Sequence, residues 1–125
     1  QLTDIPGASA AFQGSVVAYD NAVKQCILGV SQSLLEQEGA VSEACAIAMA
    51  TGCRVLFKTD YAVAITGIAG PDGGSAEKPV GLVYLAVAGP DGHQCRKLQM
   101  RGNRPRIRKV SALNAFDLLR RQLIR

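Results

Sequence analysis

The chain has 125 residues, of which 48% are hydrophobic, and it carries a net charge of +4. This length and composition predict a single domain over residues 1–125 with an apolar core, and they exclude general disorder. No apolar run approaches the roughly 18 residues of a membrane-spanning helix, so we expect no membrane partner.

The first half of the chain predicts one strand followed by helices. Residues 13–19 (QGSVVAY) are rich in β-branched and aromatic side chains, which favour a strand. Asp20 and Ser31 stand where helix caps are expected, each before a short helical stretch that stops at a glycine. Ser42 is the expected cap of a longer helix over 43–57, whose apolar surface predicts close packing on a sheet.

The second half predicts three strands and a final helix. Two apolar runs, 60–66 and 80–88, are typical of buried strands. Residues 94–100 alternate in polarity after a turn signal at 90–92, which predicts a hairpin with the preceding strand. Pro105 suits the first turn of a last helix. This order of elements predicts an α/β fold with a mixed sheet.

The four cysteines lack the C-x-x-C spacing of zinc sites, and His93 is the one histidine. We therefore expect no metal site. The simplest interpretation of the thiols is that all four are small buried side chains in a reducing cytoplasm. A catalytic cysteine would need a base nearby, and the sequence shows none.

The first candidate site is the segment AYDNAVK, which joins the predicted strand to the first helix. Tyr19 ends the strand, and Asn21 and Lys24 follow on neighbouring faces of the helix. A lysine at such a junction can act as a general base if it is buried. The alternative is a solvated lysine without a catalytic role, which the spacing alone favours.

The second candidate site is the loop TGIAGPDGGSAEKPVG, residues 66–81, between two predicted strands. Its glycines permit close approach of the backbone, and successive backbone N–H groups can bind an anion. Thr66 lies at the carboxyl end of a strand, where open α/β sheets place ligands. The loop matches neither the Walker A nor the G-x-G-x-x-G pattern. A connection without a binding role is the alternative.

The third candidate site is a basic window between Gly92 and Phe116, which contains no acidic residue. Arg104 and Arg108 are four residues apart near the expected start of the last helix, where an anion is favoured. The window has no aromatic residue before Phe116, so a stacking platform for nucleic acid is absent and we expect no nucleic-acid partner. An ordinary solvated face is the alternative interpretation.

These motifs together resemble the CinA C-terminal domain family, the nicotinamide-nucleotide amidohydrolases, and the resemblance covers essentially the whole chain. The matching motifs are Tyr19-x-Asn21-x-x-Lys24, GAVSE at 39–43, TGIAGP-x-GG at 66–74, KPVG at 78–81 and Gly102-x-Arg104-x-x-x-Arg108. The fold that the resemblance implies is a three-layer α/β/α sandwich with a mixed sheet.

The resemblance implies hydrolysis of the carboxamide of nicotinamide mononucleotide to nicotinate mononucleotide and ammonia. A serine nucleophile with a lysine partner would act without a metal or cofactor. Lys24 matches the family's lysine, and Tyr19 would either relay a proton or orient Lys24. Arg104 and Arg108 would hold the 5′-phosphate. The other residues that we assign to substrate binding are Asn21, Thr66, Gly67, Ala69, Gly70, Gly73 and Gly74.

One part of the family pattern has no counterpart here. The family's serine lies in an A-E-S-C-T-G-G type segment, which this sequence lacks, and none of its serines stands in the matching position. We therefore expect the first strand and the nucleophile to lie outside this chain, and the 125 residues alone to be inactive. The alternatives are an inactive pyridine-nucleotide-binding module and a DNA-associated competence or damage-induced protein. We also expect a homo-oligomer.

Overall fold

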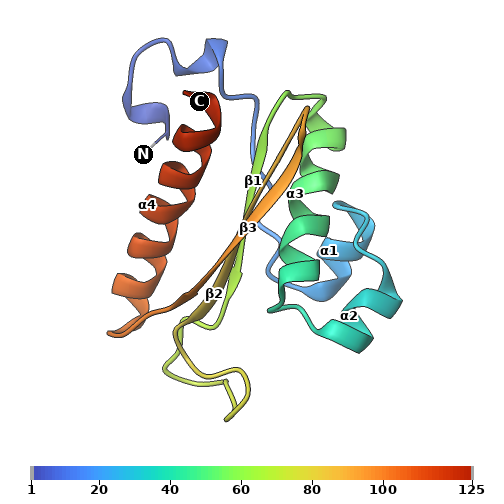
Figure 1. Ribbon diagram of the computed structural model, residues 1–125, viewed down its shortest axis with the longest axis vertical. Helices are drawn as coiled ribbons and strands as arrows, with labels where there is room; N and C mark the ends of the chain where they lie inside the picture. Colours follow the sequence, from blue (N-terminus) through green and yellow to red (C-terminus); the bar gives the residue numbers. More distant parts are fainter. Residues whose placement is uncertain (1, 125) are drawn as a thin grey trace.

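The computed structural model describes residues 2–124, which form three layers (Figure 1). The middle layer is a sheet in the order β1–β2–β3, and helices cover both of its faces. The strands are β1 (Ala62–Gly67), β2 (Leu82–Gly89) and β3 (Gly92–Gln99). On one face lie α1 (Asn21–Cys26), α2 (Gln32–Glu38) and α3 (Glu43–Phe57), and on the other lies α4 (Arg104–Leu123). This confirms the expected α/β/α sandwich.

The helices begin at the predicted residues because local side chains cap them. The side-chain oxygens of Asp20, Ser31 and Ser42 accept hydrogen bonds from backbone N–H groups two or three residues further on. Asn103 caps α4 in the same way, and Pro105 lies in the first turn of that helix, as predicted. Two short 3-10 helices, Leu2–Asp4 and Ala8–Ala10, precede α1.

The central strand β2 is buried on both faces and divides the core in two. Val83, Leu85 and Val87 face α4, where they pack with Ile107 and other apolar side chains. The alternate residues of β2 face α3 and meet a cluster that includes Ala46. The predicted hairpin of β2 and β3 is confirmed, and the three strands start and end within two residues of their predicted limits.

The strand predicted over residues 13–19 is wrong. Its side chains do alternate: Val16 and Ala18 pack partly against the cluster on α3, whereas Val17 and Tyr19 are 87% and 86% exposed. The segment nevertheless pairs with none of the three strands. Composition favours an extended chain, but a strand also needs a neighbour with which to pair. The sheet of residues 2–124 therefore contains antiparallel pairs only, and not the mixed pairing that was expected.

Candidate active site

Lys24 is the most unusual charged residue of the structure. It lies on α1 and is only 6% exposed. Its Nζ donates a hydrogen bond to the backbone oxygen of Ala18 at 2.9 Å, and among residues 2–124 it has no carboxylate partner. Buried lysines are normally paired with an acid. The spacing alone favoured a solvated lysine, and the observed burial contradicts that alternative.

The two residues predicted to work with Lys24 lie near it in the chain but point into solvent. Tyr19 is 86% exposed, and its hydroxyl makes no hydrogen bond to another described residue. Asn21 is exposed at the first position of α1. Lys24 therefore bonds to the backbone of Ala18 and not to Tyr19, the residue expected to orient it.

The glycine loop begins where β1 ends and is fixed at that end by Thr66. The Thr66 hydroxyl is buried and donates to the backbone oxygen of Ala40 at 2.7 Å, in the turn between α2 and α3. Gly67, the last residue of β1, packs directly on Val83 of β2. The peptide bond between Gly70 and Pro71 is cis.

Beyond this anchored end, the loop presents unused backbone donors. The N–H groups of Ala69, Gly70, Gly73 and Gly74 make no hydrogen bond with any other residue of 2–124. Gly73 and Gly74 have consecutive positive φ angles of 83° and 85°. Free N–H groups in such a loop can bind an anion or stabilise a developing negative charge.

Arg104 contacts this loop, whereas Arg108 does not. The Nη1 atom of Arg104 donates to the backbone oxygen of Gly70 at 3.0 Å, so the start of α4 is joined to the loop. Arg108, one helical turn later, is exposed and makes no side-chain hydrogen bond to a described residue. A guanidinium has five N–H donors, so Arg104 keeps others for a ligand.

Lys78 is a residue that the sequence analysis quoted within a motif but did not assign to the site. Its Nζ reaches across to the turn between α2 and α3 and donates to the backbone oxygen of Glu38. That turn also receives the hydroxyl of Thr66 at Ala40. Local sequence carries no signal for such a contact, because its partners are 40 residues apart.

The thiol of Cys45 is affected by burial and by the charges of two lysines. Its thiol, in the first turn of α3, is fully buried, and burial raises its pKa above the ordinary value. The positive charges of Lys24 and Lys78 act on the same thiol and partly oppose that rise. The expectation of four buried cysteines holds for Cys45 but is wrong for Cys26, which is exposed. Burial also raises the pKa values of the half-buried Cys53 and Cys95.

An open groove lies beside this turn, between α2, α3 and the glycine loop. It exposes four carboxylates against the single ammonium of Lys78, so it disfavours a phosphate. The residues that line the groove are Glu36, Gln37, Glu38, Gly39, Val41, Ser42, Glu43, Ala44, Ile47, Glu77, Lys78 and Tyr84.

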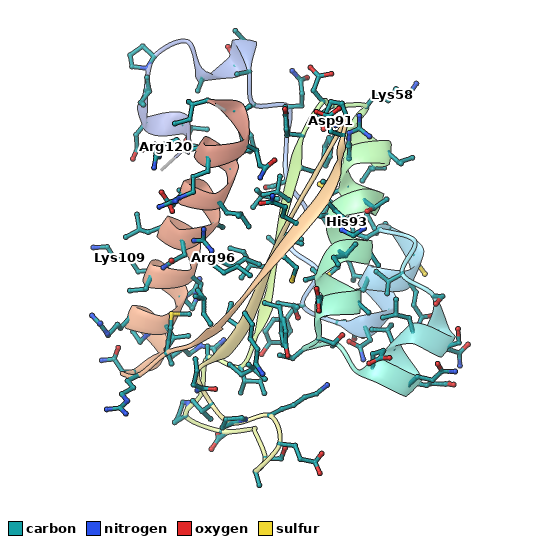
Figure 2. All side chains as sticks on the ribbon, in the orientation of Figure 1. Lys58, Asp91, His93, Arg96, Lys109 and Arg120 are labelled. Carbon is teal, nitrogen blue, oxygen red and sulfur yellow. The ribbon has the colours of Figure 1, made fainter. Side chains whose placement is uncertain are left out.

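The side chains of the basic window differ in their contacts within the protein. Arg96, labelled in Figure 2, lies between β3 and α4. It pairs with Asp117 at 3.6 Å. Arg106 donates to the backbone oxygen of Arg101 at 3.2 Å. Lys109 points away from the sheet into solvent. Of these three residues, Arg96 alone has its charge paired with a carboxylate of the described residues.

Comparison with known proteins decides the family. The family model of the CinA C-terminal domain matches residues 1–123. The chain belongs to the CinA C-terminal domain family. A CinA-like protein of Fervidobacterium nodosum is 53% identical over 99% of this chain. A putative competence-damage inducible protein of Acetivibrio thermocellus is 50% identical over the whole chain. The chain spans about 30% of the length of these curated relatives.

Solved structures agree with this assignment. The competence/damage inducible protein CihA from Agrobacterium tumefaciens superposes with a TM-score of 0.92 at 42% identity, covering 94% of this chain and 73% of that one. A CinA superfamily protein from Escherichia coli gives 0.90 at 30% identity, over 94% and 69%. Residues 2–124 of this CinA domain contain no group of three metal-binding side chains and no helix long and apolar enough to cross a membrane.

Proposed function

We propose that this CinA domain supplies the lysine and the glycine loop of an amidohydrolase site for the carboxamide of nicotinamide mononucleotide. The observation that carries the proposal is Lys24, a buried lysine whose hydrogen bond goes to a neutral backbone oxygen. A lysine without an acidic partner is suited to accept a proton from a hydroxyl nucleophile and to return it to a leaving group.

The nucleophile in this proposal is a serine outside the 125 residues. Among residues 2–124, no hydroxyl is hydrogen-bonded to Lys24 Nζ. The buried hydroxyls of Thr66 and Ser42 already donate to backbone oxygens, at 2.7 and 2.9 Å. Each therefore has a structural role at the turn between α2 and α3.

The reaction follows from these groups. The serine oxygen bonds to the carboxamide carbon while Lys24 takes the hydroxyl proton. The resulting oxyanion is stabilised by free N–H groups of the loop, such as those of Gly73 and Gly74. The tetrahedral intermediate collapses and expels ammonia, which receives the proton from Lys24. Water then attacks the acyl-serine ester, releasing nicotinate mononucleotide and the free serine.

The test uses a chimera, in which residues 1–125 follow the N-terminal part of the Agrobacterium tumefaciens relative, whose chain is longer than the region matched here. Ammonia release from nicotinamide mononucleotide is measured for the chimera and for its Lys24→Met variant. We expect turnover in the first and a loss of about a thousandfold or more in the second. Lys109→Met, an exposed lysine on α4, is the matched control and should be unchanged.

Calorimetric titration with the same nucleotide separates the alternatives. Binding by the chimera without ammonia release would replace the enzyme with a nucleotide-binding module. The absence of both nucleotide binding and ammonia release would overturn the proposal. A DNA-binding protein would instead bind duplex DNA with an affinity that falls steeply with salt.

A further inference from the structure

The glycine loop is fastened to the rest of the molecule by three side chains. Thr66 fixes its beginning to Ala40, and Arg104 fixes Gly70 to the start of α4. Lys78 fixes its far end to the backbone oxygen of Glu38. Between the last two contacts lies the tip of the loop, with the free N–H groups of Gly73 and Gly74, and the tip extends beyond the end of the sheet (Figure 1).

The anchor at Lys78 is transmitted to the tip through short local contacts. The backbone N–H of Lys78 donates to the Ser75 hydroxyl at 3.0 Å, and the Ser75 N–H donates to the Lys78 oxygen at 2.8 Å. Ser75 directly follows Gly74. Whatever holds Lys78 in place therefore also limits the positions open to Gly73 and Gly74.

The turn after α2 has room for the ammonium group of Lys78 because its first residue is a glycine. Gly39 ends α2 with a φ of 82°, and a Cβ at this position would lie 2.8 Å from Lys78 Nζ. The same glycine offers its backbone oxygen to the hydroxyl of Ser42, the cap of α3. These contacts fix the loop tip relative to the first turn of α3, which carries Cys45. The positive charge of Lys24 lowers the pKa of the Cys45 thiol, against the larger rise caused by burial.

We infer that Lys78 is a positioning residue, which holds the free N–H groups of the glycine loop in place relative to Lys24. The catalytic part of this inference rests on the proposed function. Among residues 2–124, Lys78 forms no ion pair with the carboxylates that line the groove, and its Nζ donates instead to the backbone oxygen of Glu38. This geometry suits a side chain that fixes the glycine loop to α2, because the acceptor is a backbone atom of that helix.

The first measurement is hydrogen exchange of backbone amides in the 125-residue chain. Lys78→Met removes the donor, and we expect exchange at Ser75 and Lys78 to become about tenfold faster, a factor in keeping with the loss of one charged hydrogen bond. Lys78→Gln keeps a donor without the charge, so its exchange rates should lie between those of the wild type and of Lys78→Met. Lys109→Met is the control and should leave the loop unchanged.

The second measurement is turnover of nicotinamide mononucleotide by the chimera. Lys78→Met should lower kcat about tenfold with little change in KM, because loop placement acts on the transition state. Unchanged exchange at Ser75 would overturn the anchor, and so would a higher KM with unchanged kcat, which would make Lys78 a direct ligand. Faster exchange with unchanged kcat would overturn the positioning role. A wild-type chimera without turnover refutes the proposed function, and the exchange result still decides the anchor.

Discussion

Gly52 on α3 offers the sharpest test of how the fold places Lys24. A Cβ at this position would lie 1.8 Å from the backbone oxygen of Leu28, in the turn that follows α1. Real Cβ atoms stay at least 3.0 Å from such atoms, so Gly52→Ala must move the two backbones apart by more than about 1 Å. The turn carries α1 with it, and therefore also Lys24.

Two effects of opposite sign decide the change in stability. Replacing glycine by alanine inside a helix favours the helix by about 1 kcal/mol. Overpacking against rigid backbone costs about 3 kcal/mol, the upper part of the usual range, because no flexible side chain can move aside. We therefore expect a net loss of about 2 kcal/mol and a fall in Tm of roughly 8 °C for a domain of this size.

Urea unfolding followed by circular dichroism measures the free energy of unfolding for Gly52→Ala. Thr51→Ala is the matched control, since Thr51 is exposed on the same helix and should become slightly more stable through helix propensity. In the chimera, Gly52→Ala should also lower turnover. A Gly52→Ala protein as stable as the wild type would refute the close approach of α3 and the turn after α1.

Three further outcomes follow from burial and charge. Leu85→Ala should lower the free energy of unfolding by about 3 kcal/mol in urea, because Leu85 is fully buried between β2 and α4. Hydrogen bonds from Arg120 and Arg121 lower the pKa of Asp117, so its stabilising effect is present at neutral pH and is lost as pH falls below about 3.8. The Tm difference between wild type and Asp117→Asn should accordingly disappear in acid, and a constant difference would contradict it. A thiol reagent should label Cys26 fastest in the native protein, and Cys26→Ser should remove that fast phase.

Local signals were enough to predict the helix starts and the hairpin. Ser42 caps α3 by accepting a hydrogen bond from the backbone N–H of a residue three positions later, so the adjacent sequence is enough to predict its role. Residues 13–19 show the limit of such signals. Their composition predicted a strand, but strand pairing depends on a neighbour that composition does not specify.

Long-range contacts of the site could not be predicted in the same way. The bond from Lys78 to Glu38 and the close approach of Gly52 to Leu28 join residues that are far apart in the chain. A lysine or a glycine taken alone has several common explanations. Its role becomes visible only when the partner backbone is placed beside it.

Arg104 shows how one residue can serve both the structure and a ligand. Its predicted role was to hold a phosphate, and the structure shows one of its nitrogens bonded to Gly70 of the loop. That bond orients the guanidinium at the beginning of a 20-residue helix, where the helix dipole favours an anion. Arg108 follows on the same face with no partner among the described residues. If both bind phosphate, Arg108→Ala should weaken nucleotide binding alone, whereas Arg104→Ala should also speed amide exchange in the loop near Gly70. Equal effects of the two variants on exchange would show that the bond from Arg104 to Gly70 does not hold the loop.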